Sequence, residues 1–193
     1  MNRATWLAWL LLGVWAAWLY ALQGLCVARM DSSSLVPDLG LVLLLSLAAR
    51  LSHEDLPKAA LVIAVARCAV SIDAPVAVIA ACFGAAALAR ALHEVFEVGG
   101  ALPRTLLAGA SAWAVTAWLT FVHDLRDARL ALHTAGTPPD LGLPSRALST
   151  AWSPALATAL AAFLIGPLLG RLPGLTPLAK KRQWHVVASS PWS

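Results

Sequence analysis

The sequence predicts an all-α, polytopic integral membrane protein with six transmembrane helices, and three observations support this fold class. Of its 193 residues, 60% are hydrophobic and 12% are charged, and the mean hydropathy is +0.74. Soluble domains have about 45–50% apolar and about 25% charged residues, so this chain has too few polar side chains to cover a water-exposed globule. Apolar runs also recur along the whole chain. We therefore expect one transmembrane domain over residues 1–193.

The six spans follow from the length of these apolar runs. A helix needs about 20 apolar residues to cross about 30 Å of hydrocarbon. The first run begins with only Asn2 and Arg3 as a basic region and is longer than the apolar part of a signal peptide, so we interpret it as a retained helix. The second and third are short, about 24 Å each, and are expected to cross near the membrane normal or with ordered ends. The expected spans are 5–28, 36–51, 56–71, 75–95, 102–122 and 148–172.

The later spans end in polar residues. His93 and Glu94 close the fourth span, and we interpret them as a solvated helix end and not as an acid/base site. Residues 124–147 are expected to form an outer loop, because their Pro and Gly content argues against one continuous helix. Trp152, near the start of the sixth span, fits an interfacial belt of aromatic side chains. The tail, 173–193, is expected in the cytoplasm.

Basic residues predict the orientation. The 14 Lys and Arg residues divide into nine on the side of the N-terminus, four on the opposite side, and Arg67 within a span. Loops rich in Lys and Arg stay in the cytoplasm, so both termini are expected inside. The net charge of +4 is explained in this way and does not indicate nucleic-acid binding. The nine are Arg3, Arg50, Lys58, Arg90, Arg104, Arg171, Lys180, Lys181 and Arg182.

The sequence contains no motif for catalysis or for a cofactor. The three cysteines, Cys26, Cys68 and Cys82, lie in apolar segments without the clustered ligands that zinc requires, so we interpret them as small packing residues. Catalysis within a membrane needs several titratable groups at one depth, and the spans contain few. We therefore expect no enzymatic activity, no cofactor and no metal.

Arg67 is the charged residue that needs an explanation. It lies one turn before the outer end of the third span, and Asp38 lies near the outer end of the second. In two antiparallel helices Arg67 is level with Val42, about 6 Å below Asp38, which an arginine side chain can reach. An Asp38–Arg67 ion pair is thus the expected arrangement. Asp73, in the next turn, is a competing partner, and an Arg67 that reaches the interface alone is the third alternative.

Small residues recur every four positions in several spans. The stripe in the fourth span is expected to be a helix-packing face, because small side chains let helices approach closely in lipid. Whether this face packs inside the protein or against a partner stays open. The stripe consists of Ala77, Ala81, Ala85 and Ala89.

Three segments of the chain together resemble the family of the rod shape-determining protein MreD. The second span opens with Val-Pro-Asp-Leu-Gly at residues 36–40, and the turn before the fourth span contains Ser71 and Pro75. The last span, from Ser149, contains Pro154. The resemblance covers roughly residues 5–172. The chain departs from the family pattern at Ala69, near which the family often carries an aspartate, and at Ala77, which replaces a glycine.

This resemblance implies a non-catalytic scaffold in the bacterial inner membrane. It implies a fold like that of the substrate-binding subunits of energy-coupling-factor vitamin transporters. It also implies MreC as a partner and, indirectly, the MreB filament and the peptidoglycan glycosyltransferase–transpeptidase pair. The alternative function is the vitamin-binding subunit itself, for which Asp38, Arg67, Asp73 and Trp152 are sparse candidate ligands.

Overall fold

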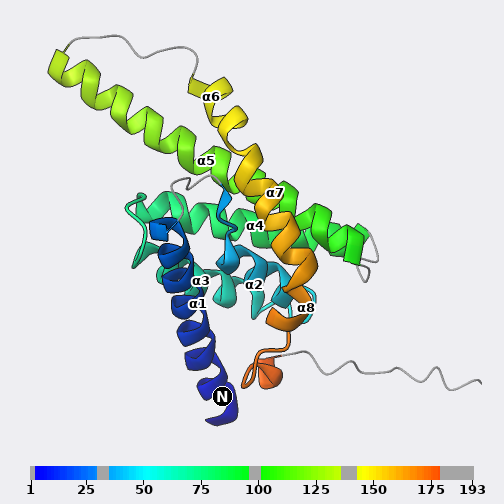
Figure 1. The fold of residues 1–193 in the computed structure, drawn as a ribbon. Coiled ribbons are helices and arrows are strands. Elements are labelled where there is room, and N and C mark those ends of the chain that lie inside the picture. Colours follow the sequence, from blue (N-terminus) through cyan, green and yellow to red (C-terminus); the bar gives the residue numbers. More distant parts are fainter. Residues whose placement is uncertain (1–2, 30–34, 96–100, 136–142, 179–193) are drawn as a thin grey trace, which may run out of the picture.

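The described part of the protein is entirely helical. Its structure is a computed structural model in which residues 3–29, 35–95, 101–135 and 143–178 are described. Every regular element within these ranges is a helix, and they pack as one bundle (Figure 1). In chain order they are α1 (Arg3–Arg29), α2 (Leu39–Ala48), α3 (Leu56–Cys68), α4 (Pro75–Val95), α5 (Ala101–Ala135), α6 (Leu143–Thr150), α7 (Trp152–Leu164), α8 (Gly166–Leu169) and the 3₁₀ turn η2 (Thr176–Leu178).

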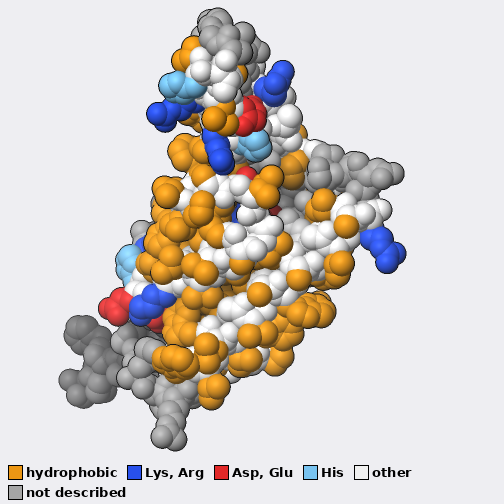
Figure 2. All heavy atoms as spheres, turned by 90° about the vertical axis from the view of Figure 1, so that its left-hand side faces the viewer, with side chains coloured by type: hydrophobic (Ala, Val, Ile, Leu, Met, Phe, Trp, Pro, Cys, Tyr) orange, Lys and Arg blue, Asp and Glu red, His pale blue; other side chains and the backbone are white. Residues whose placement is uncertain are grey.

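Four helical stretches are long and apolar enough to cross a membrane. They are Thr5–Arg29, Pro75–His93, Leu102–Thr134 and Pro144–Leu164, the last of which includes α6 and α7. Many of their large apolar side chains are exposed, among them Trp6, Val14 and Leu156. On the face in Figure 2, hydrophobic side chains cover the middle, and charged side chains gather toward the upper end and the lower left edge. A surface of this kind is suited to lipid and not to water.

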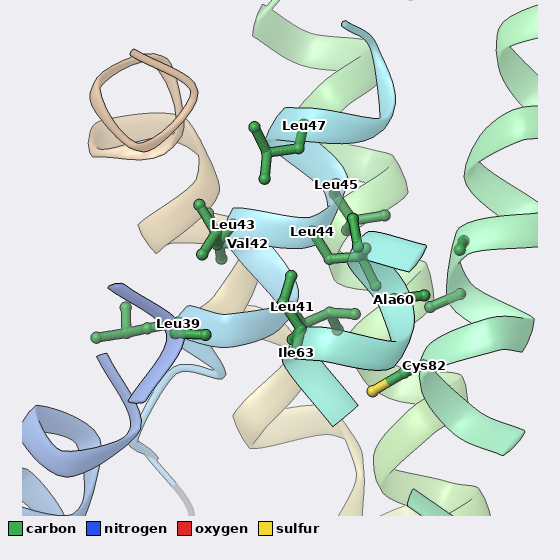
Figure 3. Packing of buried hydrophobic residues seen from close by; sticks show 14 of the residues in the cluster. Leu39, Leu41, Val42, Leu43, Leu44, Leu45, Leu47, Ala60, Ile63 and Cys82 are labelled. Atoms are coloured by element: carbon green, nitrogen blue, oxygen red, sulfur yellow. The ribbon is translucent and has the colours of Figure 1, made fainter. Parts of the chain in front are cut away.

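Helix α2 forms the centre of the bundle. Every residue from Leu39 to Leu47 is buried, and the helix contacts α1, α3, α4, α5, α7 and α8. Figure 3 shows its leucines pointing to several sides, with Ile63 of α3 and Cys82 of α4 among their neighbours. A helix that is apolar on all sides has to be enclosed by other helices. At ten residues, or about 15 Å, α2 spans only half of the hydrocarbon layer.

The expected outer loop at 124–147 is wrong in its first half. Helix α5 continues without a break to Ala135, and α6 begins at Leu143 and packs against α5. The two helices form a projection from the bundle, at the upper left of Figure 1. Residues 124–135 contain no Pro or Gly, and the Pro and Gly residues that predicted a loop all follow Ala135. At 35 residues, about 52 Å, α5 is longer than a membrane crossing requires.

The expected sixth span, 148–172, is divided into α6, α7 and α8. Pro154 has no N–H to donate to Thr150, and a turn at Ala151, whose backbone dihedrals stay helical, separates α6 from α7. Pro167 likewise cannot donate to Phe163, so the hydrogen-bond pattern of α7 is interrupted and α7 ends at Leu164; the same proline lies at the start of α8, where its missing N–H is tolerated. The Lys-Lys-Arg cluster at 180–182 lies outside the described residues.

Candidate functional site

A buried polar cluster at the N-terminal end of α2 is the main candidate site. Asp38 is the N-cap of α2, and its Oδ1 accepts a hydrogen bond of 2.9 Å from the N–H of Leu41. Its Oδ2 accepts a hydrogen bond from the guanidinium of Arg67 in α3. The Asp38 and Arg67 side chains are only 13% and 16% exposed. The structure thus contains the ion pair expected from the sequence, with both carboxylate oxygens of Asp38 occupied.

Other helices complete this polar cluster. Thr158 of α7, which is fully buried, accepts a hydrogen bond of 2.9 Å from the N–H of Asp38 at its Oγ1. Gln23 of α1 accepts one of 3.4 Å from the N–H of Leu39. A helix start leaves four N–H groups unpaired. Two of them in α2 are satisfied by side chains, one by Gln23 and one by the N-cap Asp38. The cluster ties four helices together at one depth.

Tyr20 of α1 packs directly against the start of α2. Its side chain is 5% exposed, and its hydroxyl lies near the Asp38–Arg67 pair without a hydrogen-bond partner among the described residues. A Cβ atom at Gly40 would overlap the tyrosine ring, 2.7 Å from its Cε2. Glycine at position 40 is what allows the ring to approach the α2 backbone.

Asp73, the competing partner, does not pair with Arg67. Its carboxylate accepts a hydrogen bond from the hydroxyl of Ser71 instead. Asp73 also lines a pocket of about 380 Å³ between the α3–α4 turn and the C-terminal half of α5. His123, Arg126 and Asp127 of α5 line the same pocket, and His123 lies 3.2 Å from the Asp127 carboxylate.

The alanine stripe of α4 is buried inside the bundle. Ala77, Ala81, Ala85 and Ala89 are all less than 9% exposed and belong to the core. They pack within this chain. Of the two alternatives that the sequence left open, packing inside the protein or against a partner, the structure shows the first. Close helix packing of this kind depends on small side chains.

A groove on the outside of α4 and α5 lies beside this stripe. It has a volume of about 420 Å³ and is lined by small residues, including Ala80 and Gly84 of α4, and by Ser111 and Trp118 of α5. Ser111 is 1% exposed, and its hydroxyl has no hydrogen-bond partner among the described residues. Trp118 donates a hydrogen bond of 3.1 Å to the carbonyl of Ala77 and is thereby fixed.

The remaining candidates are dispersed. Cys26 is exposed, Cys68 is half-buried and Cys82 is buried, and all three are free thiols. Within the described ranges, no three His, Cys, Asp or Glu side chains converge as a metal site. His93 is half-buried near the end of α4. Trp152 is exposed at the start of α7, and its ring lies 5.8 Å from that of Trp113 between the centroids, tilted by 47°. Trp152 is not among the residues that line the pocket beside Asp73.

Sequence reasoning missed Tyr20, Gln23 and Thr158 as members of the polar cluster. A tyrosine and a glutamine one turn apart in an apolar helix were a signal for Tyr20 and Gln23, because polar groups within a span need partners. Nothing in the sequence distinguishes Thr158 from other threonines, since its role depends on where α7 passes α2. Comparison of the chain with protein-family models, curated proteins and solved structures found no match.

Proposed function

We propose that this protein is a non-catalytic membrane scaffold of the bacterial rod-shape complex, related to MreD. In this proposal it crosses the inner membrane six times with both termini in the cytoplasm and binds MreC, and it helps to couple peptidoglycan synthesis to the MreB filament. The observation that carries the proposal is the structural use of Asp38, the aspartate of the Pro-Asp-Leu motif on which the resemblance depends. It caps α2 and pairs with Arg67, so both are engaged within the protein.

This use of the polar residues favours a scaffold over a ligand-binding subunit. A vitamin-binding site requires polar groups that are directed into a cavity and are free to bind the ligand. Asp38 and Arg67 were two of the four candidate ligands, and their side chains bind each other. A bundle whose central ion pair is satisfied internally is suited to holding partner proteins in fixed positions.

The groove between α4 and α5 is the surface on which we expect a partner transmembrane helix. Ala80 and Gly84 are four residues apart and exposed, a spacing that lets a second helix approach closely. A partner such as MreC, if anchored by a transmembrane helix, would present a surface of the required kind.

Substitution of Gly84 tests this proposal. A Cβ atom at Gly84 meets no atom within 4 Å, so Gly84→Leu fills the groove without disturbing the bundle. We expect the variant to remain folded and inserted while its recovery of MreC in affinity purification from native membranes falls at least severalfold.

Gly24→Leu is the matched control, because a Cβ atom at Gly24 of α1 also meets nothing within 4 Å. The control should recover MreC as the wild type does. Purification of the wild type with two ATPases and a coupling membrane subunit, and without MreC, would contradict the scaffold.

The vitamin-binding subunit remains the second candidate because of the pocket beside Asp73. Its walls combine apolar side chains with Asp73, His123, Arg126 and Asp127, a composition that fits a small amphipathic ligand. The same purification separates the two functions through the partners it recovers.

A further inference from the structure

Two arginines lie close together at the end of the bundle where α1 begins. Arg50 follows the C-terminal end of α2, and Arg104 is in the first turn of α5. A Cβ atom at Gly166 of α8 would lie 3.6 Å from Arg104 Nε, and one at Gly170 would lie 3.5 Å from Arg50 Nε. Gly166 and Gly170 are four residues apart, about one helical turn, so the two guanidiniums lie along the same face of α8.

The positive charge of these side chains is not neutralised within the described protein. Arg50 donates one hydrogen bond of 2.6 Å, to the carbonyl of Gly170, which leaves its other N–H groups available. The Nε of Arg104 is buried and has no hydrogen-bond partner in the part of the chain that the structure describes. Among the described residues, neither guanidinium forms an ion pair with a carboxylate. An arginine that is half-buried without a counter-charge is unfavourable, so an external anion is expected to bind the remaining N–H groups of the two side chains.

The surroundings indicate a lipid as the source of this anion. The segment after α8 packs on the N-terminal half of α1, where Trp15 donates a hydrogen bond of 3.3 Å to the Pro173 carbonyl. The pair lies where α2 ends and α5 begins, and the helix ends of a spanning bundle meet a layer of headgroups. Leu102 and Leu106 of α5 are each 72% exposed and Leu168 of α8 is 66% exposed, so the same elements offer an apolar surface suited to acyl chains.

We propose that Arg50 and Arg104 bind the phosphate of an anionic glycerophospholipid at this end of the bundle. The guanidinium of Arg matches a phosphate with two parallel hydrogen bonds. The glycines at positions 166 and 170 leave the α8 backbone bare beside both side chains, and the hydroxyl of Ser46, 3.6 Å from the Gly166 Cβ position, is a further donor at the site. In the orientation predicted from the sequence, this is the cytoplasmic leaflet.

Native mass spectrometry of the purified full chain with phosphatidylglycerol tests the site. Arg104 makes no hydrogen bond through its Nε, so Arg104→Gln is expected to fold and to bind phosphatidylglycerol about tenfold or more weakly, the effect of losing one charge-assisted hydrogen bond. Arg171→Gln is the matched control, since it removes an exposed charge at the same end. It should bind as the wild type does.

Three results would overturn the proposal. These are unchanged binding by Arg104→Gln, an equal loss in Arg171→Gln, and displacement of the lipid by an equal concentration of inorganic phosphate, which would identify a soluble anion as the ligand. If Arg104→Gln does not fold, Arg104→Lys replaces it. Lysine keeps the charge but lacks the planar pair of donors, so severalfold weaker binding is expected and wild-type binding would contradict the assignment.

Discussion

Asp38 combines two structural roles in one side chain. One carboxylate oxygen caps the N-terminus of α2, and the other pairs with Arg67. The cap satisfies an unpaired N–H group and places negative charge at the positive end of the helix dipole. The ion pair neutralises an arginine that would otherwise be buried alone among apolar helices. Removal of one side chain leaves the other buried without a counter-charge. Such a single substitution is therefore expected to lower stability by more than the ion pair itself contributes.

A double-mutant cycle tests this dependence. Arg67→Ala leaves a buried carboxylate unpaired and is expected to lower the free energy of unfolding in detergent by about 3–5 kcal/mol. Asp38→Ala should lower the free energy of unfolding by a similar amount. The loss in the double variant should be much smaller than the sum of the two single losses. The charge-swapped variant, Asp38→Arg with Arg67→Asp, should recover part of the loss. Additive effects of the two alanine substitutions would show that the pair carries no coupling energy.

Asp38→Asn separates the two roles within the same cycle. Asparagine caps a helix about as well as aspartate but has no charge. It should therefore be less destabilising than Asp38→Ala, by about 1 kcal/mol for the retained cap. Equal destabilisation by Asn and Ala would show that the cap contributes nothing measurable.

At the scale of elements, α2 depends on the close approach of α1. Tyr20 occupies the space that a side chain at position 40 would need. Gly40→Ala should therefore lower the free energy of unfolding by about 1–3 kcal/mol through overpacking. The measurement is denaturant or thermal unfolding of the purified protein.

Changing Tyr20 in the same background provides the control. Tyr20→Ala removes the ring, so Gly40→Ala added to it should have little cost. Tyr20→Phe keeps the ring, so Gly40→Ala added to it should cost as much as in the wild type. If Tyr20→Ala does not reduce the cost, the overlap with the ring is not its cause.

At the scale of the whole molecule, the bundle has two ends that should face opposite sides of the membrane. The α2–α3 connection lies at the end that contains Arg50 and α8, and the outer part of α5 forms the projection at the other end. In a variant without its three native cysteines, we introduce one cysteine at His53 or at His133, both exposed positions. In intact cells, a membrane-impermeant maleimide should label His133→Cys and not His53→Cys. The reverse pattern would invert the orientation, and equal labelling would contradict a spanning bundle.

The sequence by itself determined the helical membrane class and several helix boundaries. The beginning of α3 at Leu56 and both ends of α4, Pro75 and Val95, agree with expectation, since prolines and polar residues mark those positions locally. The Asp38–Arg67 pair could also be predicted from the sequence, because two antiparallel helices joined by a short connection have a fixed register. These features depend on residues that are near each other in sequence or on composition.

Only the tertiary structure decided the rest. It placed α2 in the centre, buried the alanine stripe within the chain, and brought Tyr20 and Thr158 to Asp38 from helices distant in sequence. It also showed that α5 continues past residue 124, which the Pro and Gly residues farther along had obscured. The physical reason is that lipid and a helical neighbour both favour apolar side chains, so hydropathy cannot tell a lipid-facing side chain from one packed in the core. Only the positions of the other helices separate them.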